Sequence, residues 1–120
     1  MPGGRVLSDV LNLGQSRTLV NALGSISGAT SVDLLLGDVI TATITGATAF
    51  TFTNVPPTGK CCCITMILVN PGTNVSFATV PKWPAGAPPT LSVTGTDIIT
   101  LMTVDGGTTW YAVASSIGAA

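Results

Sequence analysis

The sequence predicts an all-β fold: an antiparallel, jelly-roll-like β-sandwich with an extended N-terminal arm. Three observations favour this fold class. Turn signals recur roughly every 8 to 12 residues after the first quarter of the chain, and about eight short segments lie between them. These segments are rich in Val, Ile, Thr and Phe, which fit a pleated strand better than a helix. Gly, Pro and Asn occupy the joins, as is typical of a sandwich or jelly roll.

The chain has 120 residues, the length of one domain. Residues 1–28 are predicted to form the arm and residues 29–120 the β-sandwich domain. Glycines interrupt short apolar groups in the arm. We expect these groups to be buried against the chain's own sandwich or across a neighbouring subunit, with a disordered arm as the third alternative. The arm residues predicted to contact a neighbour are Arg5, Val6, Leu7, Val10, Leu11, Arg17, Leu19 and Val20.

The first two predicted strands follow the arm, at residues 31–36 and 39–45. Gly37 and Asp38 lie between them and are residues that favour a tight turn. The sequence therefore predicts that these two strands pair as a hairpin.

The third predicted strand covers residues 48–53, after a turn at Gly46. Phe and Thr alternate along it. Because side chains of a strand point to its two faces in turn, Phe50 and Phe52 are predicted to enter the core and the threonines to face outward.

The central strand is predicted at residues 61–69, which are apolar at nearly every position. A strand that is apolar on both faces needs cover on both, from a second sheet and from an arm or another subunit. An Asn-Pro-Gly turn signal begins at residue 70. A short strand over residues 75–80, centred on Phe77, follows it.

The last predicted hairpin joins strands at residues 97–104 and 108–114. Asp-Gly at position 105 favours the turn between them, because that turn needs a positive φ. Trp110 and Tyr111 are adjacent, so one ring is expected inside the sandwich and the other outside or on a subunit.

Three consecutive cysteines, Cys61, Cys62 and Cys63, form the most unusual motif. The first and third share one face of a strand, and Cys62 lies on the other. Zinc sites usually combine two separated pairs of ligands, and the chain has no other Cys and no His, so no metal and no cofactor is expected. The thiols are predicted to pack as small apolar groups, with bridging between chains as the alternative. Cys62 and Tyr111 are further interface candidates.

Prolines fix residues 82–89 as a loop. Its one large side chain, Trp83, is expected either to plug the end of the sandwich or, with Lys82, to form a platform that contacts a sugar or a partner. Asp97 and Asp105 flank the last hairpin and resemble a carboxylate pair. We interpret them as turn residues and expect no catalytic role.

Charged residues make up 8% of the chain, against roughly 25% in typical soluble domains. The four basic residues are scattered and the net charge is -1, so the chain has no basic patch that would bind nucleic acid.

The apolar runs are far shorter than the ~20 residues of a spanning helix, so no membrane segment is expected. No secretory signal is visible, which favours assembly in a cytoplasm. With no His and no Glu, the chain is predicted not to be an enzyme.

Four stretches of the chain form a recognisable combination: Val80-Pro-Lys-Trp-Pro-Ala-Gly-Ala-Pro-Pro-Thr-Leu91, the strand at residues 97–104, Asp105-Gly-Gly-Thr-Thr-Trp-Tyr111 and the Thr-rich strands at residues 44–52. With these stretches, residues 29–111 resemble a β-structured module of tailed-phage virion proteins, found at the tips of tail fibres and among small head decoration (cement) proteins. The resemblance implies a virion structural protein, commonly a homotrimer, that binds other protein or a host surface.

Only about 28 residues precede the module, whereas a tail fibre has a long N-terminal section. We therefore expect a capsid decoration protein that bridges subunits of the major capsid protein and stabilises the head. A tail fibre tip or short receptor-binding protein is the alternative, with a host glycan bound near Lys82 and Trp83.

Overall fold

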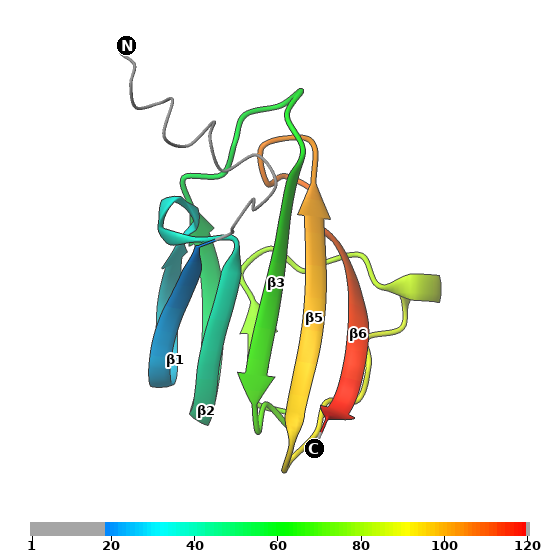
Figure 1. The fold of residues 1–120 in the computed structure, drawn as a ribbon. Coiled ribbons are helices and arrows are strands. Elements are labelled where there is room, and N and C mark those ends of the chain that lie inside the picture. The colour runs from blue at the N-terminus through cyan, green and yellow to red at the C-terminus, as the bar shows by residue number, and fades with distance from the viewer. Residues whose placement is uncertain (1–18, 120) are drawn as a thin grey trace, which may run out of the picture.

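The computed structural model describes residues 19–119 and confirms an all-β fold. Figure 1 shows the described elements of this part of the chain. They are the strands β1 (Val20–Asp33), β2 (Val39–Thr53), β3 (Cys62–Val69), β4 (Val75–Phe77), β5 (Thr96–Thr103) and β6 (Tyr111–Ala119), and the 3₁₀ turns η2 (Leu34–Leu36) and η3 (Pro84–Gly86). Residues 20–28, assigned to the arm by sequence, lie in β1. Six of the predicted arm contacts, Arg5, Val6, Leu7, Val10, Leu11 and Arg17, lie outside the described residues.

The strands form one mixed sheet in the order β1-β2-β3-β5-β6, with β4 also paired to β2. β3 pairs with β5, and β5 with β6, in antiparallel orientation, as predicted. β1 pairs with β2 in parallel, and β2 pairs in parallel with both β3 and β4. The expectation of an antiparallel sandwich is therefore wrong for this half of the sheet.

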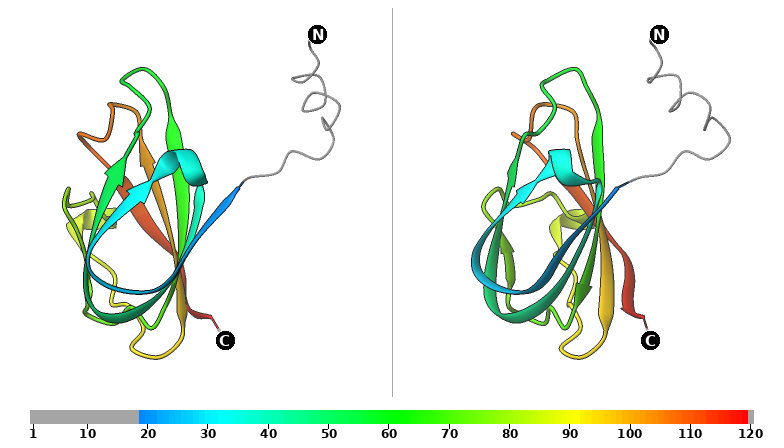
Figure 2. Two further views of the ribbon diagram at one scale, coloured as in Figure 1. Left: turned by 90° about the vertical axis from the view of Figure 1, so that its left-hand side faces the viewer. Right: turned by 60° about the vertical axis from the view of Figure 1, so that its left-hand side comes forward.

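β1 and β2 each curve from one layer of the fold into the other, and Figure 2 shows both bending over together. Residues 39–43 of β2 pair with β3 in one layer, and residues 48–50 pair with β4 in the opposite layer. The register of β1 against β2 shifts next to Gly24 and Gly28. Both glycines have positive φ, 75° and 80°, which residues with a side chain adopt at a cost, so they mark the bend.

The hairpin predicted at Gly37 is not present. η2 begins after Asp33, whose side chain accepts a hydrogen bond from the Leu35 N–H at 2.9 Å. The chain then passes back to the start of the first layer, where Val39 lies beside Val20. The turn predicted at Gly46 is also wrong, because β2 continues through it. Turn residues here move the chain between layers and do not reverse it within one sheet.

The core lies between the two layers and follows the alternation of the strands. Every second residue of β3 and β5 points inward, and Phe50 of β2 is fully buried while Thr51 is exposed. Trp110 is 2% exposed, and its ring packs against that of Phe52 with the centroids 5.0 Å apart and the planes tilted by 46°. The other buried apolar residues are Val32, Leu34, Ile40, Ala42, Ile44, Cys62, Ile64, Met66, Leu68, Ile99, Leu101 and Ala112.

Gly37 has no room for a side chain. A Cβ built on it lies 2.5 Å from the backbone oxygen of Leu19, at the point where β1 begins beside β2. We expect Gly37→Ala to lower the free energy of unfolding by about 1–3 kcal/mol, the usual cost of overpacking. Chemical denaturation measures this value. Gly59→Ala is the matched control for backbone conformation, since Gly59 also has positive φ but nothing lies within 4 Å of its Cβ position. Equal losses in both variants would contradict the steric explanation.

Candidate functional site

The outward face of β2, β3, β5 and β6 is the candidate functional surface, called the outer face below. Ile67 of β3 lies opposite Ile98 of β5, and both are half-buried. Met102 of β5 lies opposite Tyr111 of β6, and these side chains are 39% and 48% exposed. Val113, 46% exposed, lies opposite Thr100 on the same face. The face therefore presents an apolar surface across three neighbouring strands.

Charge is almost absent from the strands that form the outer face. Within the described chain, β2, β3, β5 and β6 contain one charged residue, Asp97, and its side chain is fully buried on the inner side. The remaining positions of the outer face are mostly threonine, as at Thr41, Thr65 and Thr100. A surface of this composition meets the description of a protein interface better than that of a solvated face.

Asp97 holds the end of the sheet together. Its two carboxylate oxygens accept hydrogen bonds from the Ser92 N–H at 2.6 Å, the Ser92 hydroxyl at 2.7 Å and the Gly118 N–H at 2.7 Å. Burial raises the pKa of this carboxyl, but the three hydrogen bonds outweigh burial and hold the pKa below its ordinary value. The side chain thus joins the loop before β5 to the end of β6.

Asp105 is likewise a turn residue. It accepts hydrogen bonds from the Thr103 hydroxyl and the Thr109 N–H, each at 2.9 Å, and the Thr109 bond is the main cause of its lowered pKa. Seven residues of strand and turn lie between it and Asp97, so the two residues are up to about 26 Å apart at the rise of a strand. The two carboxylates therefore have separate structural roles, as the sequence predicted.

The side chains of the three cysteines point in directions that differ from those the interface prediction required. Cys62 is 7% exposed and belongs to the core, so its candidacy as an interface residue is corrected. Cys61 and Cys63 are exposed on the opposite side, so the expectation that all three pack as apolar groups holds for Cys62 alone. Burial is the main cause that raises the pKa of the Cys62 thiol.

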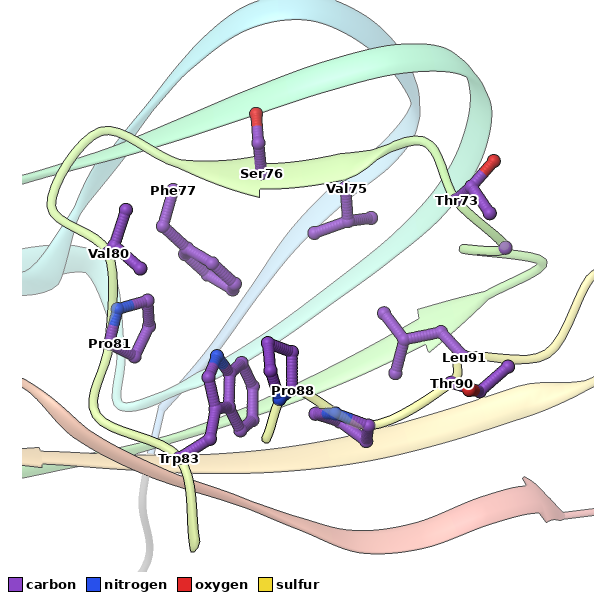
Figure 3. A pocket seen from close by; sticks show the side chains of 12 residues that line it. Thr73, Val75, Ser76, Phe77, Val80, Pro81, Trp83, Pro88, Thr90 and Leu91 are labelled. Carbon is purple, nitrogen blue, oxygen red and sulfur yellow. The ribbon is translucent and has the colours of Figure 1, made fainter. Parts of the chain in front are cut away.

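A second feature is a cavity of about 390 Å³ between β4 and the proline-rich loop, shown in Figure 3. Trp83 and Phe77 point into it, and Trp83 also packs against the core. The loop is fixed to β6 by backbone bonds of Lys82, whose N–H donates to the Trp110 carbonyl at 2.7 Å and whose carbonyl accepts from the Ala112 N–H at 3.0 Å. Lys82 itself is exposed. The other lining residues are Gly72, Thr73, Val75, Ser76, Val80, Pro81, Pro88, Pro89, Thr90 and Leu91.

Comparison of the chain with protein-family models, curated proteins and solved structures found no match in any of the three. Among residues 19–119, no three His, Cys, Asp or Glu side chains gather closely enough to hold a metal ion. In the same residues no helix has the length and hydrophobicity needed to span a membrane.

The structure brings together fewer of the predicted residues than the sequence expected. Leu19 and Val20, at the start of the edge strand β1, are exposed, at 68% and 57%. Tyr111 lies on the outer face, whereas Lys82 and Trp83 lie at the loop. Sequence reasoning missed Ile98 and Val113 as surface residues. A signal was available in the sequence: Ile98 is two residues from Thr100, and Val113 is two residues from Tyr111. Residues two apart lie on the same face of a strand.

Proposed function

We propose that this protein is a viral structural protein, a homotrimeric decoration protein of a phage head that stabilises the capsid by bridging its subunits. The observation that supports this proposal is the outer face: apolar and Thr-rich residues over β3, β5 and β6 with no exposed charge on those strands. The resemblance of residues 29–111 to tailed-phage virion modules supports the part of the proposal that assigns the protein to a phage particle.

The proposed mechanism is burial of surface and involves no chemical step. Specific protein interfaces bury about 1,600 Å² in total, and apolar area removed from water contributes roughly 25 cal/mol per Å² before the costs of association. A trimer repeats this contact three times, so loss of one subunit requires two interfaces to break. In this proposal the outer face holds the subunits together, and the N-terminal segment contacts the major capsid protein.

A tail fibre tip that binds a host glycan is the second candidate function. The observation that favours it is the cavity beside Trp83, because an indole face and hydroxyls such as Ser76 and Thr90 suit a sugar ring. Electron microscopy of particles with the protein labelled distinguishes the two: the label is expected on the head for a decoration protein and on the tail for a fibre tip.

The trimer proposal is tested by a charge on the outer face. We expect Ile67→Asp and Ile98→Asp each to convert a trimer into monomer at micromolar concentration, because an unpaired carboxylate buried in an interface costs several kcal/mol. Sedimentation velocity measures the mass of the species. Val93→Asp is the control, since Val93 is 74% exposed on a loop.

Circular dichroism establishes that each variant is folded, so that loss of assembly is distinguished from unfolding. If Ile67→Asp unfolds the chain, Thr100→Lys tests the same face from a polar position. A wild-type protein that sediments as monomer throughout this concentration range would contradict the proposal. So would trimers that survive both aspartate substitutions.

A further inference from the structure

Two cysteine thiols are adjacent at the start of β3. The Sγ atoms of Cys61 and Cys63 are 3.6 Å apart, and both side chains are exposed. Residues two apart along an extended chain project on the same side. Cys62, between them, points into the core. The pair is therefore accessible, and the third thiol is separated from it by the backbone.

The geometry of this pair suits chelation better than a disulfide. A metal ion bonded to three sulfurs at about 2.3 Å, with angles near 120° between the bonds, holds each pair of sulfurs roughly 4.0 Å apart. The observed separation of 3.6 Å is within about half an ångström of that value. A disulfide requires about 2.05 Å between the sulfurs and prefers Cα atoms about 5.5–6 Å apart. Two residues of extended strand separate Cα atoms by about 6.6 Å, near the upper limit of the disulfide range.

A third sulfur lies beside the pair on the neighbouring strand. Met102 of β5 is the direct partner of Cys63 in the antiparallel register. Its neighbours Leu101 and Thr103 are buried, so the Met102 side chain, 39% exposed, lies on the same side of the sheet as Cys63. Directly paired side chains in a sheet have Cβ atoms about 4.5–5.5 Å apart. A flexible thioether at this distance reaches an ion held by the two thiolates.

We propose that Cys61, Cys63 and Met102 form a binding site for Cu(I). Two thiolates and a thioether are soft ligands, which select Cu(I) among biological metal ions. Zinc prefers four ligands drawn from Cys, His and carboxylates, and this chain has no His. Binding forms two Cu–S bonds to thiolates and one to the thioether, and it releases one proton from each thiol. The copper remains Cu(I), so no oxidant or reductant is required. All three sulfur ligands come from one subunit, so the site is complete within a single chain.

Anaerobic titration of the full-length reduced protein with Cu(I), in competition with a chromophoric Cu(I) chelator, tests the proposal. We expect one Cu(I) per chain with a thiolate-to-copper absorption band in the near ultraviolet. Cys61→Ser and Cys63→Ser are each expected to weaken binding at least 100-fold. Met102→Leu, which keeps volume and removes the sulfur, is expected to weaken it about tenfold, in the range found when supporting ligands are removed.

Cys62→Ala is the matched control within the same triplet, because its thiol is in the core and faces away from the pair. We expect it to keep the wild-type stoichiometry and Cu(I) affinity while it lowers the melting temperature. The proposal is overturned if the wild type takes up no Cu(I) in this titration, if Cys62→Ala loses as much affinity as Cys63→Ser, or if Met102→Leu binds as tightly as wild type.

Discussion

Phe50→Ala is expected to lower the free energy of unfolding by about 3–5 kcal/mol, the usual cost of truncating a buried aromatic side chain. Phe50 is completely buried in β2, where its neighbours across the sheet are Thr30 of β1 and Phe77 of β4. Its ring lies 5.8 Å from that of Phe77. Loss of the ring leaves a cavity between the two layers. Because β2 is paired with β1 on one side and β4 on the other at this residue, the strand cannot move inward to fill the cavity.

Thermal and urea denaturation measure this effect. A change of this size is a large part of the 5–15 kcal/mol that stabilises a typical domain, so Phe50→Leu provides a milder variant if Phe50→Ala does not fold. Thr51→Ala, one residue along on the exposed face, is expected to change stability by less than about 0.5 kcal/mol. Similar losses at Phe50 and Thr51 would show that the curved part of β2 does not bury Phe50.

Asp97→Asn is expected to lower the free energy of unfolding by about 2–4 kcal/mol at neutral pH. The carboxylate accepts three hydrogen bonds, and bonds to a charged group contribute roughly 1.5–3 kcal/mol each when a partner is removed. The asparagine amide has the same shape but only one acceptor oxygen. Its NH₂ group therefore faces at least one of the groups that donate to the carboxylate in the wild type, which are the N–H and hydroxyl of Ser92 and the N–H of Gly118. One buried donor is then left without an acceptor.

Asp97 also predicts an acid dependence of stability with a definite sign. Its pKa is lowered in the folded state, so its contribution is fully present above the unfolded pKa of about 3.9 and is lost as pH falls toward the folded value. Urea denaturation of wild type at several pH values between 6 and roughly 2 is expected to show stability decreasing below pH 4. Asp97→Asn is expected to decrease less over the same interval. Parallel curves for the two proteins would contradict the assigned hydrogen bonds.

Local pattern predicted several features correctly. The Phe-Thr alternation placed Phe50 inside and Thr51 outside, because a strand side chain has two possible directions and its polarity selects one. The adjacency of Trp110 and Tyr111 predicted that one ring lies inside and the other outside, and the structure places Trp110 inside. The Asp-Gly signal predicted the antiparallel pairing of β5 and β6, because this turn joins neighbouring strands over a short distance.

The candidate surfaces were predicted only in part. Cys61, Cys62 and Cys63 are identical side chains, so polarity gives no sign of which one points inward. The cross-strand pairs Ile67–Ile98 and Cys63–Met102 depend on the register of β3 against β5. Because some thirty residues of the chain separate the paired positions, no local pattern specifies this register. A shift of that register by one residue would move every side chain to the other face.

The sequence by itself determined that this chain is all-β, that Phe50 lies in its core and where its last hairpin turns, because these features depend on alternation and on the backbone preferences of a few adjacent residues. The tertiary structure alone decided the parallel pairing of β1 with β2 and of β2 with β3 and β4. Parallel strands are brought together by the path of the chain between layers. That path depends on the bends at Gly24 and Gly28 and on the core that both layers share, which no local pattern records.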